Sequence, residues 1–190
     1  MFLASFEKKS VRSSSGVALA PEFDLSMDHE GGYFDMIVLG AGSLGDTSND
    51  PTTTAAGMKY LQKHHDAGGL IMTVCNGASC VASLGLLDGA IATTNSLFLD
   101  QFRADYPKVR WISLADNTER RFVRSTDKIV TTAGITAGID GMLDTIEEWC
   151  GWEVAEATRQ CLEWPLSIER NKQIATTTIT TTAILEQQQE

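Results

Sequence analysis

One hydrophobic segment constrains the fold of this chain more than any other. Leu70–Val74 is apolar and partly β-branched, and it passes directly into Cys75-Asn76-Gly77-Ala78. Such a run is typical of a parallel strand that is buried on both faces. The small and polar residues after it predict a sharp turn, followed by a short helical segment that ends near Gly85. A strand, a turn and a helix in this order indicate an α/β protein.

Strands and helices are expected to alternate along the rest of the chain. The hydrophobic patterns predict further strands over Phe34–Leu39, Val109–Leu114 and Ile129–Thr132. They predict helices over residues 51–67, Gly138–Trp149 and Trp152–Leu162. Polar residues at Ser125–Lys128 indicate a hairpin turn before the strand at Ile129. We therefore expect a mainly parallel sheet with helices on both faces.

The length and composition fit one compact domain. The chain has 190 residues, of which 43% are hydrophobic, and this is enough for one substantial core. We assign residues 1–168 to a single domain and residues 169–190 to a low-complexity tail rich in threonine and glutamine. For this tail disorder is the favoured interpretation, and an extra edge strand is the alternative.

The net charge and the cysteines limit the possible partners and compartments. A formal charge of −10 at pH 7 disfavours nucleic acid and anionic membrane as partners. The sequence has no apolar run of transmembrane length and no recognisable signal peptide, so a cytoplasmic protein is expected. Its four cysteines form no metal-binding or disulfide pattern, so we expect reduced thiols, no metal and no cofactor.

Cys75 is the candidate reactive residue. A thiol at the carboxyl end of a buried strand, where the backbone turns into a helix, lies near peptide N–H groups that stabilise a thiolate. The N–H of Asn76 is then placed to bind a developing oxyanion, and the small residues Gly77 and Ala78 let a ligand approach the backbone. A buried and inert core cysteine is the alternative, and position alone supports both equally. For Cys80, Cys150 and Cys161 the core interpretation is favoured.

Two segments of the sequence resemble the signatures of a known family. The first is Thr73–Ala78, followed by Leu84–Gly89 and Ala92–Thr94, and the second is Thr132–Asp140. Together they resemble ThiJ/PfpI proteins of the class I glutamine amidotransferase-like type. The likeness covers about residues 11–164 and is closest to the branch that contains isonitrile hydratases.

The resemblance implies both a fold and a site. It implies a flavodoxin-like three-layer sandwich, a homodimer and a small-molecule substrate, with Cys75 as the catalytic nucleophile. Backbone amides of a turn complete the oxyanion hole in such proteins, and Ala41 and Gly42 occupy the matching positions here. With Asn76 and Gly77 they form the expected binding site for an oxyanion or substrate.

The sequence departs from the family pattern in two places. Where relatives have a histidine after paired threonines, this chain has Asn95, which can form hydrogen bonds to a substrate but does not titrate. His64 and His65 do not match that position, and they are expected to be solvated. Relatives also begin with a strand-helix unit that carries an acidic residue, and this unit has no counterpart here. Three explanations are a shortened sequence, which is favoured, strand donation within a dimer, and replacement by Ile174–Leu185.

Three functions agree with these observations. The first is a cysteine-dependent hydratase that converts an isonitrile to an N-substituted formamide, a hydro-lyase reaction. The second is a non-catalytic or redox-sensing domain that keeps the family fold. A further alternative is an enzyme that acts on reactive carbonyls, like a glyoxalase or deglycase.

Overall fold

A four-stranded sheet forms the centre of the molecule. The computed structural model describes residues 4–5, 10–12, 16–25, 34–40, 51–112 and 121–165. In sequence order, the central strands are β5 (Met36–Leu39), β6 (Leu70–Val74), β9 (Phe122–Thr126) and β10 (Ile129–Thr132). In the sheet they lie in the order β5-β6-β10-β9, with β6 parallel to both neighbours and β9 antiparallel to β10.

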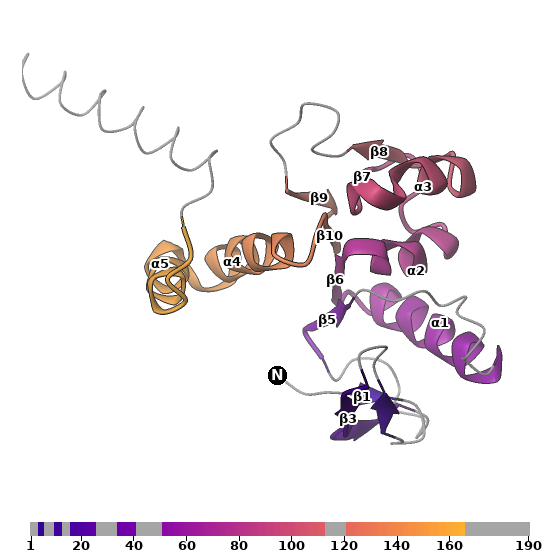
Figure 1. Ribbon diagram of the computed structural model, residues 1–190, viewed down its shortest axis with the longest axis horizontal. Helices are drawn as coiled ribbons and strands as arrows, with labels where there is room; N and C mark the ends of the chain where they lie inside the picture. Colours follow the sequence, from indigo (N-terminus) through magenta and orange to yellow (C-terminus); the bar gives the residue numbers. More distant parts are fainter. Residues whose placement is uncertain are drawn as a thin grey trace, which may run out of the picture.

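Five α-helices in the described residues cover the two faces of this sheet (Figure 1). One face carries α1 (Pro51–Asp66), α2 (Ala78–Ser83) and α3 (Leu99–Asp105), and the other carries α4 (Ala137–Cys150) and α5 (Trp152–Cys161). The predicted α/β class, with a mostly parallel sheet between helices, is therefore confirmed. Within these residues, no helix is both long and apolar enough to cross a membrane.

Strand β6 is buried on both faces, as its composition predicts. Ile71 belongs to the core cluster that includes Leu61 of α1 and Val81 of α2. Met72, the next residue, lies in a second cluster on the opposite face with Val130 of β10. Both Ile71 and Met72 have no exposed surface. Because successive side chains of a strand point to opposite faces, this one strand contributes to the core under both helical layers.

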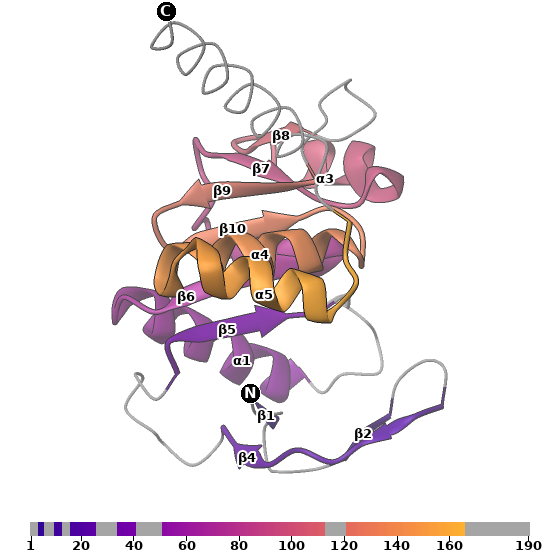
Figure 2. The same ribbon diagram turned by 90° about the vertical axis from the view of Figure 1, so that its left-hand side faces the viewer.

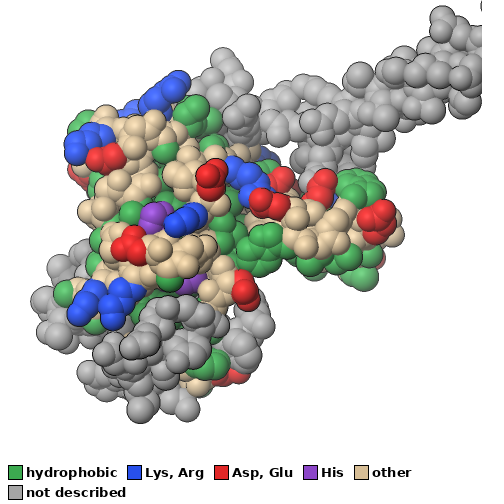
Figure 3. Space-filling view, turned by 180° about the vertical axis from the view of Figure 1, so that it is seen from behind, with side chains coloured by type: hydrophobic (Ala, Val, Ile, Leu, Met, Phe, Trp, Pro, Cys, Tyr) green, Lys and Arg blue, Asp and Glu red, His purple; other side chains and the backbone are tan. Residues whose placement is uncertain are grey.

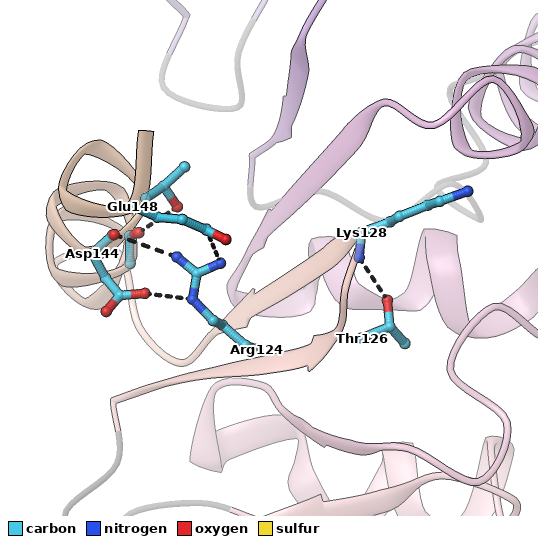
Figure 4. A network of polar contacts seen from close by, with 7 residues as sticks. Arg124, Thr126, Lys128, Asp144 and Glu148 are labelled. Atoms are coloured by element: carbon cyan, nitrogen blue, oxygen red, sulfur yellow. Dashed lines mark hydrogen bonds and ion pairs between the residues drawn. The ribbon is translucent and has the colours of Figure 1, made fainter. Parts of the chain in front are cut away.

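Helix α4 is held close to the sheet by a glycine and by ion pairs. A Cβ atom on Gly141 would lie only 2.8 Å from Cγ2 of Thr132, so glycine permits the close approach. From β9, Arg124 reaches the same helix: its Nε lies 2.8 Å from Oδ2 of Asp144, and its guanidinium also pairs with Glu148 (Figure 4). These contacts fix α4 over β9 and β10.

A pair of short strands extends the structure beyond β9. Strands β7 (Ile91–Thr93) and β8 (Arg110–Ile112) are parallel to each other. They are tied to the central sheet by a hydrogen bond of 2.9 Å that the N–H of Thr93 donates to Oγ1 of Thr131. Threonine side chains thus take part in connecting the strands of this protein.

Two more short pairs lie on the other side of the sheet, beyond β5 (Figures 1 and 2). They are formed by β1 (Ala4–Ser5) with β4 (Phe23–Asp24), and by β2 (Val11–Arg12) with β3 (Ala18–Leu19). None of these strands is hydrogen-bonded to β5. Within the described ranges, one edge of β5 therefore has no strand partner.

Most of the predicted elements are present close to their predicted bounds. The strands predicted to begin at residues 34, 70, 109 and 129 correspond to β5, β6, β8 and β10. The predicted hairpin turn at Ser125–Lys128 joins β9 to β10, and the pairing of these strands contains a bulge. Helix α3 was missed, because only two of its seven residues, Leu99 and Phe102, are buried. So short a stretch gives no clear helical periodicity in the sequence.

The prediction for His64 was wrong. Its side chain is buried, with 1% of its surface exposed, and Nε2 donates a hydrogen bond of 3.0 Å to the carbonyl oxygen of Leu70. The ring lies over Gly69, where a Cβ atom would come within 2.1 Å of it. No local pattern indicates this packing, because it depends on how the chain folds back between α1 and β6.

Candidate functional site

Cys75 lies directly after β6 in a backbone conformation that residues other than glycine rarely adopt. Its φ is 59°, and among the described residues Glu163 is the only other non-glycine residue with a positive φ. Holding a cysteine in this conformation costs about 1–3 kcal/mol. Cys75 begins the 3₁₀ turn Cys75–Gly77, which continues directly into α2. The predicted strand, turn and helix are confirmed, and the strained residue is Cys75 itself.

Thr94 helps to hold this strained backbone. Its Oγ1 donates a hydrogen bond of 3.0 Å to the carbonyl oxygen of Cys75, and Thr94 has no exposed surface. The neighbouring residue Thr93 is fixed to Thr131 of β10. Thr94 was not predicted as a site residue. Its contact joins residues 19 positions apart, and no local pattern in the sequence reveals such a contact.

Gly77 allows the turn to pack against the end of β5. A Cβ atom at this position would lie 2.6 Å from the carbonyl oxygen of Gly40 and 2.9 Å from that of Leu39. Both neighbours are backbone atoms, so any larger residue would force the turn and the strand apart. The structure therefore gives Gly77 a packing role, and its predicted role in binding a substrate stays a prediction.

Two predicted site residues, Asn76 and Asn95, directly follow the two residues of this hydrogen bond, Cys75 and Thr94. Asn76 is half-buried in the 3₁₀ turn directly after Cys75. Asn95 follows Thr94, and its Oδ1 accepts a hydrogen bond of 3.0 Å from the N–H of Leu97, which caps a short 3₁₀ helix. Its carboxamide oxygen is thus engaged in a local cap, and its predicted role in binding a substrate stays a prediction.

The predicted turn at Ala41 and Gly42 lies outside the described residues. The described part of the preceding strand ends at Gly40, and the carbonyl oxygen of this residue is the atom that a Cβ on Gly77 would approach most closely. The chain therefore leaves β5 immediately beside the cysteine turn. The roles of Ala41 and Gly42 in an oxyanion hole remain predictions.

The sulfur of Cys75 has no acid or base partner in the described part of the chain. No hydrogen bond or ion pair links its side chain to another of these residues. His64 bonds to Leu70, at the opposite end of β6. His65 lies beside Asp66 at the end of α1, where the closest approach of the two side chains is 3.4 Å. The site built by these residues is a buried cysteine with a strained backbone, whose carbonyl oxygen accepts a hydrogen bond from Thr94.

The other cysteines differ from Cys75 and from one another. Cys80 is as buried as Cys75, with 6% of each residue exposed, but it lies in ordinary helical backbone within α2. Burial raises the pKa of the Cys80 thiol, so this residue stays protonated near neutral pH. Its predicted core position is confirmed. For Cys150 and Cys161 that prediction was wrong, because each is the last residue of its helix and is exposed to solvent.

The family of the chain follows from a comparison with known families. Residues 1–148 match the model of the DJ-1/PfpI family. The chain belongs to the DJ-1/PfpI family. The ThiJ/PfpI resemblance of the two sequence signatures is thereby confirmed, and the segment that contains Cys75 lies within the match.

Individual DJ-1/PfpI proteins agree with this assignment. The "Parkinson disease protein 7 homolog" of Danio rerio is 27% identical over 149 residues, which are 78% of this chain and 73% of that protein. The crystal structure of a THiJ/PfpI family protein from Pseudomonas syringae has a TM-score of 0.68 at 23% identity. This match covers 87% of the present chain but only 63% of the Pseudomonas protein.

A second solved structure is that of oxidized DJ-1 from Toxoplasma gondii. It has a TM-score of 0.64 at 26% identity, and the match covers 87% of this chain and 83% of that protein. The structural matches confirm the α/β architecture of the DJ-1/PfpI fold. The sequence around Cys75 and the surrounding backbone thus lie in a fold shared with these proteins.

Proposed function

We propose that this DJ-1/PfpI protein is an enzyme in which Cys75 is the nucleophile toward a small electrophilic substrate. The observation that carries the proposal is the left-handed backbone of Cys75 at the carboxyl end of β6, stabilised by Thr94. Backbone strain of this kind is found mainly where function requires it. A buried cysteine whose only task is packing has no need of this conformation, as Cys80 illustrates.

Hydration of an isonitrile is the specific reaction that we assign to Cys75. The thiolate attacks the terminal carbon of R–N≡C, and this carbon takes a proton from water, which gives the thioimidate R–N=CH–S–Cys75 and hydroxide. Hydroxide then adds to the same carbon. As the C–S bond breaks, the proton of the new hydroxyl group moves to nitrogen, and the products are R–NH–CHO and the free thiolate. The sum is one isonitrile and one water giving one N-substituted formamide.

The site residues have distinct roles in this proposal. Backbone N–H groups of Asn76 and Gly42 stabilise the negative charge that develops on the substrate. The NH₂ group of Asn95 orients the substrate. The proposal also includes a homodimer, since pocket walls in α/β proteins are often built from loops and neighbouring subunits.

Consumption of an aryl isonitrile tests the assigned reaction. The full chain should convert it to the N-aryl formamide, and Cys75→Ala should abolish the conversion. Cys80→Ala is the matched control, because Cys80 is equally buried five positions further along the chain. The rate with Cys80→Ala should stay near that of the unmodified chain. Equal rates for Cys75→Ala and the unmodified chain would remove Cys75 from the reaction.

Redox sensing is the second candidate, and two observations favour it. The described residues give Cys75 no acid or base partner for a multistep reaction, and the Toxoplasma gondii relative is described as oxidized. In a sensor the thiolate attacks hydrogen peroxide, the O–O bond breaks, and the products are Cys75 sulfenic acid and hydroxide. Peroxide treatment followed by peptide mass mapping should then place the first added oxygen on Cys75 and not on the six methionines.

A further inference from the structure

A large apolar groove lies between the sheet and the helices α4 and α5. Its volume is about 510 Å³, within the range of about 300–1,000 Å³ that is typical of ligand sites. Uncharged residues of β5, β6, α4 and α5 form its walls, among them Val38, Met72, Val74, Ile139, Ile146 and Leu162. Exposed apolar surface on this scale indicates a binding site.

The apolar surface continues from the groove to the outer end of the two helices. Residues three or four positions apart share one face of a helix. Trp149 therefore extends the row of Ile146 on α4, and Val154 extends the row of Thr158 on α5, both of which line the groove. Trp149, Val154 and the groove residue Leu162 are 50%, 47% and 56% exposed. We call the groove and these exposed residues the apolar strip.

The two helices that carry the apolar strip are strongly acidic. Between Ala137 and Glu163 the chain has seven Asp or Glu residues and one basic residue, Arg159, so the formal net charge of this part is −6, out of −10 for the whole chain. Figure 3 shows hydrophobic side chains along the lower side of the arm formed by α4 and α5, with acidic side chains at its outer end. A second copy would bring two such arms together, and the repulsion of like charges disfavours that partner.

The acidic side chains differ in how they are neutralised. Toward β9, Arg124 pairs with Asp144 and Glu148 of α4. Glu153 and Glu163, in contrast, each stand next in the chain to an exposed apolar residue of the strip. Both are exposed and form no ion pair within the described part of the chain. Positive charge on a partner is therefore complementary to the surroundings of the strip.

We infer that the apolar strip binds a cationic amphipathic helix of a partner protein. The apolar face of this helix enters the groove, and its lysine or arginine side chains pair with Glu153 and Glu163. The exposed ring of Trp149 also attracts such cations. Met72 and Met142 in the groove walls adapt to the shape of an apolar side chain. The inference does not depend on the reaction assigned to Cys75.

A synthetic peptide tests this binding with the full chain. The probe is a fluorescein-labelled peptide of about 18 leucine and lysine residues, with the leucines on one face of the helix, and fluorescence anisotropy measures its affinity. The control peptide has the same composition, with leucines on all sides. The amphipathic peptide should bind at least about ten-fold more tightly than the control. Equal affinities would show simple charge attraction and overturn the inference.

A substitution in the groove tests where the peptide binds. Leu162→Lys places a charge in the apolar wall and should weaken binding at least about ten-fold. Leu97→Lys is the matched control, because it makes the same change at a residue that is 86% exposed in the turn before α3, on the opposite face of the sheet. It should change the affinity less than about two-fold. Equal affinities of the two variants would show that the peptide binds elsewhere.

Neutralising the acidic residues tests the charge complementarity. The double variant Glu153→Gln, Glu163→Gln should weaken binding about three- to ten-fold at low salt, and less in concentrated salt. The control is Asp105→Asn with Asp127→Asn, two exposed acids of α3 and of the β9–β10 hairpin, which changes the net charge of the chain equally. Equal losses in the two double variants would show that only the overall charge matters, and this would overturn the inference.

Other occupants of the groove give different results. If the unmodified chain sediments as a dimer and Leu162→Lys as a monomer, a second copy covers the groove and the inference is wrong. If the unmodified chain binds neither peptide, its own residues or another kind of ligand occupy the groove, and the inference is wrong as well.

Discussion

The hydroxyl group of Thr94 donates a hydrogen bond of 3.0 Å to the carbonyl oxygen of Cys75. This contact connects the loop after β7 with the turn after β6, which lie far apart in the sequence. Since Thr94 is fully buried and Cys75 has a φ of 59°, the bond stabilises a backbone conformation that is unfavourable by itself. The geometry of the candidate nucleophile thus depends on a residue outside its own strand-turn-helix unit.

Replacement of Thr94 tests this dependence. Thr94→Val keeps the shape of the side chain but leaves the Cys75 carbonyl group without its donor, and it should lower the free energy of unfolding by about 1–3 kcal/mol. Thr94→Ser keeps the hydroxyl group and should lose much less of this hydrogen-bond contribution. Urea unfolding measures both values. Equal stability of the valine and serine variants would show that the hydrogen bond contributes nothing.

Gly77→Ala should destabilise the turn. The added Cβ would meet two carbonyl oxygens of β5 and the residue after it at 2.6 and 2.9 Å, and relief of such overlap costs about 1–3 kcal/mol. For a chain of this size, each 1 kcal/mol lowers Tm by roughly 2–4 °C. Gly40→Ala is the control, since nothing lies within 4 Å of a Cβ at that position. If both variants melt at the same temperature, the packing of the turn on β5 is not as tight as described.

The stability of the chain should decrease at alkaline pH in part through Cys80. Burial raises the pKa of this thiol above its ordinary value of 9.0, so the folded chain binds the proton more tightly than the unfolded chain does. This contribution to stability is fully present below the ordinary pKa and is lost as the pH rises through the pKa of the folded state. Between about pH 8 and about pH 10, the unmodified chain should therefore lose more stability than Cys80→Ala. An identical pH dependence would exclude the effect.

The ion pairs of Arg124 should make a small contribution that depends on salt. Arg124→Met removes the contacts to Asp144 and Glu148 on α4, and because these groups are partly solvated the loss should be about 0.5–1 kcal/mol. Arg110→Met, at an exposed position of β8, should change stability less. In concentrated salt the difference between the two variants should shrink, because exposed charges are screened. A difference that persists in salt would indicate packing by the arginine side chain instead.

Local patterns in the sequence predicted the elements that depend on local chemistry. The apolar run at Leu70–Val74 predicted a strand buried on both faces, and the small residues after it predicted the turn. The left-handed φ of Cys75 was not predicted from the residues around it. The contacts that accompany it, from Thr94 to the Cys75 carbonyl group and from Gly77 to the end of β5, join segments that are distant in the sequence. The burial of His64 was missed for the same reason, since its place depends on Gly69 and Leu70 in the folded chain.

The exposed cysteines illustrate another limit of the sequence. Cys150 and Cys161 stand beside apolar residues in amphipathic helices, and this pattern favoured burial. In the structure both lie at the last position of a helix, where the side chain faces solvent. Periodicity identifies the buried face of a helix but gives little information about its final turn, where the neighbouring elements decide which side chains are covered.

The proposed role of Cys75 as a reactive nucleophile depends on its backbone geometry, and alkylation rates test this role most directly. With Cys150→Ser and Cys161→Ser in the background, native protein is treated with iodoacetamide, and labelling of Cys75 and Cys80 is followed by mass spectrometry. The two residues are equally buried, at 6% exposed, so burial alone predicts equal rates. We predict that Cys75 reacts at least about ten-fold faster than Cys80. Equal protection of both thiols in native protein, with labelling of both after denaturation, would contradict this account.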